Sequence, residues 1–185
     1  NLRADTRTFA QTLQKAREDG LRVIALVGNA CTTSTGTYDP LDEMADFAQK
    51  EGLWFHVDGA HGGSAAFSEK YRHLVKGIER ADSVVIDFHK MMLTPALTTA
   101  VLFRNGGHSY ETFAQKAEYL LVNGKKQAWY DSAGRTLECT KKMLGVKVFA
   151  LIKLYGDKIF ADYINTTYDL GYTLAGMLKR ESGFE

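Results

Sequence analysis

The sequence has 185 residues, of which 45% are hydrophobic and 24% are charged, and this is the composition of an ordinary globular domain. Lys and Arg number 23 against 22 Asp and Glu, so we expect neither nucleic acid nor a membrane surface as a partner. The two cysteines, Cys31 and Cys139, are too few for a disulfide framework or a four-ligand zinc site, which favours a cytoplasmic location. We also expect no membrane span and no signal peptide, and we expect small molecules or other subunits as partners.

The first half of the chain alternates between helical and strand patterns. Helices are predicted between Asp5 and Gly20 and between Asp39 and Gly52, because each shows helical apolar spacing and ends at a glycine. A short helix is predicted over 71–78. Strands are predicted over 23–27, which we expect to be buried on both faces, and over 54–57, 84–86 and 99–103. This alternation predicts an α/β fold with a mostly parallel sheet flanked by helices.

The second half is predicted to be helix and loop. We predict a turn at Gly106 and Gly107, a helix over residues 112–121 and an exposed loop over residues 123–126. Two long helices follow, and we expect the apolar stripes of both to be buried. The stripe of the first is Leu137, Leu144, Val148, Leu151 and Tyr155, and that of the second is Phe160, Tyr163, Thr167, Leu170, Leu174 and Met177.

Polar side chains follow three of the predicted strands, at the edge where open parallel sheets bind ligands. They are Thr32, Thr33 and Ser34 after the first strand, Asp58 and His61 after the second, and Asp87, His89 and Lys90 after the third.

Asp58 and Lys90 are the residues of this set with the clearest chemistry. If its apolar strand buries Asp58, the carboxylate needs a cationic partner, which a structural arginine, a helix N-terminus or a protonated ring nitrogen would provide. Lys90 is either a solvated lysine at a strand end or an amine nucleophile whose pKa is lowered by burial. An acid and a lysine on neighbouring strand ends are together what a pyridoxal phosphate enzyme requires.

A metal site competes for the same region. His56, Asp58 and His61 are ligand types close together in the sequence, and strand alternation places His56 and Asp58 on one face. The minor alternative is therefore a metal-dependent hydrolase, although no further cluster of ligand residues completes the set.

Four segments resemble the group II pyridoxal-phosphate-dependent amino-acid decarboxylases, which include glutamate, diaminobutyrate, cysteine sulfinate and aromatic amino acid decarboxylases. The segments are ACTTSTGTYDP (30–40), FHVDGAHGG (55–63), GIERADS (77–83) and DFHKMM (87–92). They occur in family order with family-like spacing. The resemblance implies part of the large domain of the aspartate-aminotransferase-like fold (pyridoxal phosphate fold type I) over 1–135. It also implies a helical segment over 136–185 that leads toward a C-terminal small domain.

The resemblance implies a role for each residue that matches the family pattern. Lys90 would bind the cofactor covalently, Asp58 would contact its pyridine nitrogen, Ala60 its ring, and Thr33 and His89 would lie beside it. The segment AEYLL (117–121) is similar to the mobile catalytic loop of the family, so the resemblance gives Tyr119 the role of protonating the substrate carbon after carbon dioxide leaves.

The resemblance also implies the activity and the assembly. We expect decarboxylation of a small amino acid to its amine by a homodimer. The segment 87–90 favours a diaminobutyrate-type substrate and Met91-Met92 a glutamate-type one.

The chain departs from the family pattern at some positions. Gly59 and His61 stand where many relatives have alanine and an aromatic residue. The phosphate-binding loop, a histidine that stacks on the ring and the substrate-carboxylate arginine have no counterpart here. We therefore expect that this is a piece of a longer chain or that a separate chain supplies these residues. The alternative is a non-catalytic or regulatory protein that keeps the fold.

Overall fold

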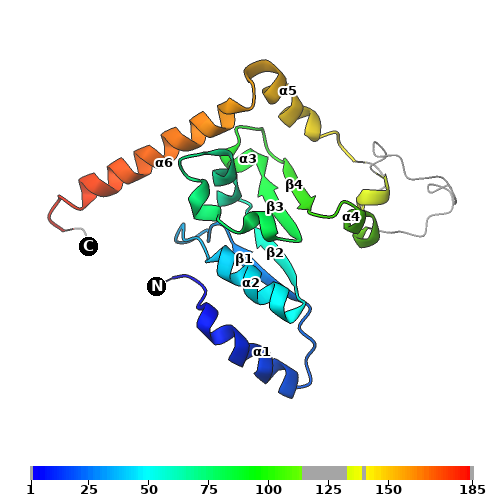
Figure 1. Ribbon diagram of the computed structural model, residues 1–185. Helices are drawn as coiled ribbons and strands as arrows, with labels where there is room; N and C mark the ends of the chain where they lie inside the picture. Colours follow the sequence, from blue (N-terminus) through cyan, green and yellow to red (C-terminus); the bar gives the residue numbers. More distant parts are fainter. Residues whose placement is uncertain (1, 114–132, 139–140, 184–185) are drawn as a thin grey trace.

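The computed structural model describes residues 2–113, 133–138 and 141–183, and Figure 1 shows the order of their helices and strands. The elements are the 3-10 helix η1 (Thr6–Thr8), α1 (Phe9–Glu18), β1 (Ala25–Asn29), α2 (Leu41–Glu51), β2 (Trp54–Asp58), the 3-10 helices η2 (Gly62–Phe67), η3 (Arg72–Val75) and η4 (Ile78–Arg80), β3 (Ser83–Asp87), α3 (Phe88–Met91), β4 (Thr99–Phe103), α4 (Gly107–Thr112), the 3-10 helix η5 (Ala133–Arg135), α5 (Gly145–Tyr155) and α6 (Lys158–Leu178).

The four strands form one sheet in the order β1-β2-β3-β4. β1, β2 and β3 are parallel, and β4 pairs antiparallel with β3. The α2 crossover between β1 and β2 is the connection that parallel neighbours need, since a hairpin cannot join them. The predicted α/β fold with a mostly parallel sheet is confirmed.

Helix α2 begins and ends where the sequence predicts. Asp42 and Glu43 lie in its first turn, where carboxylates stabilise the positive end of the helix, and Gly52 ends it with a φ of +66°. Its apolar face is buried against the sheet, with Met44 and Ala48 almost inaccessible.

The sheet is covered differently on its two faces. Phe55 and Val57 of β2 point toward the α2 side and are buried, and a Cβ on Gly28 of β1 would meet Leu41 and Met44 of α2. Val27 points to the other face and is 53% exposed. The prediction that the first strand is buried on both faces is therefore wrong for the described residues, because α2 covers only one face.

Three predicted local elements differ from the structure. Residues 71–78 contain the short η3 turn and the start of η4 instead of one helix. Gly107 begins α4 where a turn was predicted, and α4 ends at Thr112, which is the first residue of the predicted helix 112–121. Residues 114–121 of that helix lie outside the described residues.

Helices α5 and α6 bury less of their apolar surface than their spacing predicts. Phe160 and Ile164 of α6 enter the same core as the sheet, whereas Leu170, Leu174 and Met177 are more than half exposed. Figure 1 shows why, since the C-terminal half of α6 extends beyond the rest of the chain.

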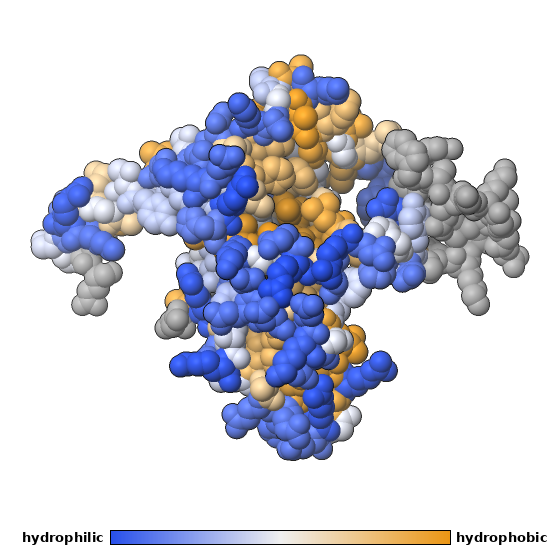
Figure 2. All heavy atoms as spheres, viewed as in Figure 1, coloured by the Kyte–Doolittle hydropathy of each residue, from blue (hydrophilic) through white to orange (hydrophobic). Residues whose placement is uncertain are grey.

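The side chains of α5 follow the same pattern. Val148 and Leu151 of α5 pack against the core, but Phe149 and Leu154 are exposed, and Figure 2 shows hydrophobic side chains gathered on the surface over this helix. In the part of the chain that the structure describes, no helix is both long and apolar enough to cross a membrane.

Candidate active site

The predicted site residues that the structure describes follow the strands at one edge of the sheet. This edge holds the carboxyl ends of the parallel strands β1, β2 and β3, and the antiparallel pairing brings Thr99, the first residue of β4, opposite Asp87. Backbone hydrogen bonds join the loops that follow the strands: Ala30 N–H donates to the Asp58 carbonyl (2.7 Å), and Asp87 N–H donates to the Ala60 carbonyl (3.0 Å). The loops after all three parallel strands are thus held against one another.

Asp58 ends β2 with an exposed side chain. Its Oδ1 accepts a hydrogen bond from the Ala60 N–H (3.1 Å), and no ion pair to Asp58 forms among the described residues. The expectation that the strand partly buries this carboxylate is wrong, because the last residue of the strand projects past the sheet edge. The exposed oxygen is consequently available to a cationic group outside the chain.

Lys90 lies on the short helix α3, three residues beyond the end of β3. Its side chain is 38% exposed, and its Nζ lies 2.8 Å from Oδ2 of Asp87. Of the two alternatives for Lys90, a solvated lysine or an amine that burial makes nucleophilic, this exposure favours the first, and the residue lies just past the strand end. The turn of α3 brings the amine back over the strand end, where a carboxylate faces it.

His89 is mostly buried and is held by the backbone of the β4 side. Its Nδ1 lies 3.1 Å from the Thr98 N–H and 3.0 Å from the Thr98 carbonyl. The same carbonyl also accepts a hydrogen bond from Phe88 N–H, so the backbone around Thr98 fixes the ring of His89. Nε2 then points toward Asp87, whose Oδ2 lies 3.8 Å away.

Thr33 is at the exposed tip of the loop that follows β1. The loop is closed on itself by hydrogen bonds between Thr32 and residues 36 and 37. Its far end is fixed by Asp39, which is 8% exposed and accepts hydrogen bonds from the backbone of Asn29 and Ala4 (2.9 Å each). Asp39 therefore has a structural role in holding the Thr33 loop against β1.

Two further titratable groups respond to the charge of Lys90. Burial raises the pKa of the Cys31 thiol, and this outweighs the opposing effect of the lysine. Partial burial and the positive charge of Lys90 both lower the pKa of His61. Both groups are therefore neutral at pH 7.

A tyrosine pair connects the site to α6. The Tyr38 hydroxyl lies close to the Tyr168 hydroxyl and donates to the Gly62 carbonyl (3.3 Å). Burial, followed by the contact with Tyr168, raises the pKa of Tyr38 far above its usual value. The hydroxyl pair is neutral, and it joins α6 to the loop that follows β1, which in turn contacts the start of η2 through Gly62.

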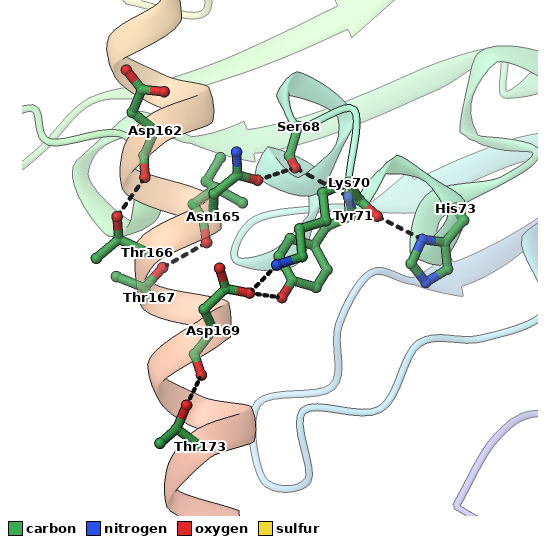
Figure 3. A network of polar contacts seen from close by, with 11 residues as sticks. Ser68, Lys70, Tyr71, His73, Asp162, Asn165, Thr166, Thr167, Asp169 and Thr173 are labelled. Atoms are coloured by element: carbon green, nitrogen blue, oxygen red, sulfur yellow. Dashed lines mark hydrogen bonds and ion pairs between the residues drawn. The ribbon is translucent and has the colours of Figure 1, made fainter.

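Figure 3 shows a second set of contacts between α6 and the segment after β2. Ser68 Oγ donates to Asn165 Oδ1 (2.5 Å), and Asp169 accepts hydrogen bonds from Lys70 (2.5 Å) and the Tyr71 hydroxyl. These side chains lie on one side of α6. They hold the helix against the segment that continues from the site.

The structure gives no support to a metal centre. His56 Nδ1 is 2.7 Å from Ser83 Oγ at the middle of the sheet, away from the exposed end where Asp58 and His61 lie. Across the described ranges, no group of three His, Cys, Asp or Glu side chains converges to hold a metal ion.

Tyr119, the remaining predicted site residue, lies outside the described residues. Three residues without a predicted role in the site form contacts around it. Thr99 binds Asp87, Tyr168 binds Tyr38, and Asp39 anchors the loop. The spacing Asp87-x-x-Lys90 on a helical turn is a sequence signal for the ion pair, whereas Tyr168 lies 130 residues from its partner and leaves no such signal.

Comparisons with known proteins all indicate one family. The family model described as "Pyridoxal-dependent decarboxylase conserved domain" matches residues 1–185. The chain is 34% identical over 175 residues to an acidic amino acid decarboxylase of Xenopus tropicalis, covering 94% of this chain and 34% of that protein. It is 34% identical over 173 residues to an aspartate 1-decarboxylase of Aliivibrio fischeri, covering 94% of this chain and 31% of that protein.

The fold is also found among solved structures. The crystal structure of mouse CSAD in apo form matches with a TM-score of 0.88 and 29% identity, covering 99% of this chain and 38% of that chain. The chain thus spans about a third of the length of the curated relatives it matches.

Proposed function

Because the chain belongs to the pyridoxal-dependent decarboxylase family, we propose that the intact protein binds pyridoxal 5'-phosphate through Lys90 and removes the α-carboxylate of a small amino acid. The observation that carries the proposal is the placement of one primary amine and one exposed carboxylate at the same sheet edge. Lys90 follows β3 and Asp58 ends β2, and these two strands are parallel neighbours.

The described residues fit this cofactor. An aldehyde needs a primary amine, which Lys90 presents with its side chain 38% exposed. A protonated pyridine nitrogen needs an anionic partner, and the exposed oxygen of Asp58 has the right charge and is free of ion pairs with the described residues. When bound, the cofactor supplies a conjugated ring that accepts the electron pair left by the departing carbon dioxide.

Each residue then has a distinct task. Asp58 holds the proton on the ring nitrogen, because its negative charge stabilises the cationic form. Lys90 would hold the cofactor covalently through its amine. Ala60 would face the ring of the cofactor with only a methyl group, and its carbonyl keeps the loop after β2 bonded to Asp87.

The substrate we propose is a small amino acid with an acidic side chain. The names of the two relatives, an acidic amino acid decarboxylase and an aspartate 1-decarboxylase, support this class over a diaminobutyrate type. Carbon dioxide release from aspartate, glutamate and 2,4-diaminobutyrate by the intact protein distinguishes the three. A kcat/KM highest for 2,4-diaminobutyrate would refute the acidic class.

Borohydride reduction followed by peptide mass mapping tests the covalent link. We expect the reduced cofactor on Lys90 of the intact protein and no covalent label in Lys90→Ala. A label on another lysine, or no cofactor absorbance at all, would contradict the proposal and favour a non-catalytic protein that keeps the fold.

For Tyr119 we propose the proton-donor role, and for the intact protein a homodimer. Removing a general acid costs about 10²–10⁴ in the step that it serves. Tyr119→Phe should therefore release carbon dioxide at first but inactivate during turnover, with rescue by added pyridoxal phosphate. Amine formation at the wild-type rate without inactivation would exclude Tyr119, and an active monomer in sedimentation would exclude the dimer.

A further inference from the structure

The amine of Lys90 has a defined partner in the protein. Lys90 Nζ lies 2.8 Å from Oδ2 of Asp87, and the Asp87 side chain is only 13% exposed. Asp87 is the last residue of β3 and Lys90 the third residue of α3, so the pair is fixed by one turn of backbone. The carboxylate therefore faces the lysine at close range from a rigid position.

Asp87 is itself held from several directions. Its Oδ1 accepts a hydrogen bond from Thr99 Oγ1 (2.6 Å), across the antiparallel pair that places these two residues opposite each other. Its N–H donates to the Ala60 carbonyl (3.0 Å). Burial acts to raise the pKa of Asp87, but hydrogen bonds from Lys90 and Thr99 outweigh it and hold the pKa below its usual value. The carboxylate is thus charged, oriented and unable to turn freely toward solvent.

The other titratable groups around Lys90 do not compete for its charge. The Cys31 thiol and the His61 imidazole feel the charge of Lys90 but are neutral at pH 7. His89 Nε2 faces the same oxygen of Asp87 but from farther away, at 3.8 Å against 2.8 Å for Lys90 Nζ. Within the described ranges, Asp87 is the acid that forms an ion pair with Lys90.

We propose that Asp87 is a positioning residue that fixes the amine of Lys90 at the sheet edge through their ion pair whenever Lys90 is not covalently bound to the cofactor. This inference rests on the proposed function, because it concerns the same lysine. To attack the cofactor aldehyde, the ammonium first loses one proton to solvent. Its remaining two protons leave with the aldehyde oxygen as water when the carbon–nitrogen double bond forms. Asp87 thus keeps the free lysine at the sheet edge where the cofactor is proposed to bind.

Competitive acetylation of the intact protein, freed of cofactor, measures this directly. An amine held against a carboxylate is less available to acetic anhydride than an unpaired one, so the labelling rate of Lys90 reports how firmly the ion pair with Asp87 holds it. We expect Asp87→Asn to raise that rate about three- to tenfold relative to the exposed lysines Lys50 and Lys158, a range discounted for partial exposure of the pair.

Asp82→Asn is the matched control. Asp82 precedes the same strand and pairs with Arg104 (2.5 Å), so its loss removes a carboxylate without touching Lys90. We expect no change at Lys90 in this variant. An equal rise at Lys90 in both variants, or no rise in Asp87→Asn, would overturn the proposal.

A second variant covers the case in which Asp87→Asn does not fold. Thr99→Val leaves the charge of Asp87 in place but removes the hydroxyl that orients it, so we expect a smaller rise in the same direction. If Thr99→Val folds and the acetylation rate of Lys90 is unchanged, Thr99 does not orient Asp87 and the proposal that an oriented carboxylate holds Lys90 is contradicted. Acetylation needs no cofactor, so its outcome is independent of the borohydride test. If the proposed function is wrong, the borohydride test fails whatever the acetylation result.

Discussion

Gly77 is the position at which a single added methyl group should be most damaging to the fold. Its φ is +97°, and an ideal Cβ would lie 2.5 Å from Asp42 N, 2.6 Å from Asp42 Cα and 2.7 Å from Leu41 C. All three atoms belong to the backbone at the start of α2, which cannot rotate aside as a side chain can. Gly77→Ala must therefore displace either α2 or the turn into η4.

The magnitude follows from two separate costs. A non-glycine residue in the left-handed region costs roughly 1–2 kcal/mol. Forcing an atom into a packed space costs roughly 1–3 kcal/mol more, so Gly77→Ala should lower the free energy of unfolding by about 2–5 kcal/mol. Gly36→Ala is the matched control, because Gly36 has a φ of +64° with nothing within 4 Å of its Cβ position. Gly36→Ala should lower the free energy of unfolding by only the first of these two costs, that of the left-handed backbone.

Urea unfolding of the intact protein, followed by circular dichroism, compares the two variants. We expect the midpoint of Gly77→Ala to fall well below that of Gly36→Ala, at similar slopes. If the two variants lie within about 0.5 kcal/mol of each other, the close approach of Gly77 to α2 does not exist in solution and the reasoning is refuted.

Three other predictions concern the site and its surroundings. A Cβ on Gly62 would lie 2.8 Å from Cys31 N and from Tyr38 Cζ, so Gly62→Ala must shift the segment after β2. The variant should bind pyridoxal phosphate roughly tenfold more weakly in a fluorescence titration, and an unchanged affinity would argue against a cofactor beside this segment. Leu93 has a φ of +60°, so Leu93→Gly should be about 1 kcal/mol more stable than Leu93→Ala in urea, and the reverse order would exclude a left-handed Leu93. Asp42 has its pKa lowered by its partners Lys76 and Arg80, so its stabilising contribution is present above the unfolded pKa and disappears as the pH falls through the lowered value. In Asp42→Asn the free energy of unfolding should therefore fall less steeply as the pH is lowered below about 4. The same pH dependence in both proteins would contradict this.

Much of the sheet could be predicted from the sequence because its signals are local. The predicted strand over 99–103 is the observed β4, and Gly52 ends α2 as its left-handed preference predicts. The placement of Asp58 and Lys90 at one edge also followed from sequence order, since consecutive parallel strands end on the same side. The expected family followed from short strings of residues around these same strand ends.

The surroundings of those residues required the tertiary structure. The sequence alone did not show that β4 is antiparallel and so brings Thr99 to Asp87, because pairing direction depends on how the chain returns to the sheet. Nor did it show that Tyr168 reaches Tyr38, or that Ile164 rather than Leu170 faces the core. Helical spacing identifies which residues share a face, but only the packing of α6 against the rest of the chain decides which part of that face is buried.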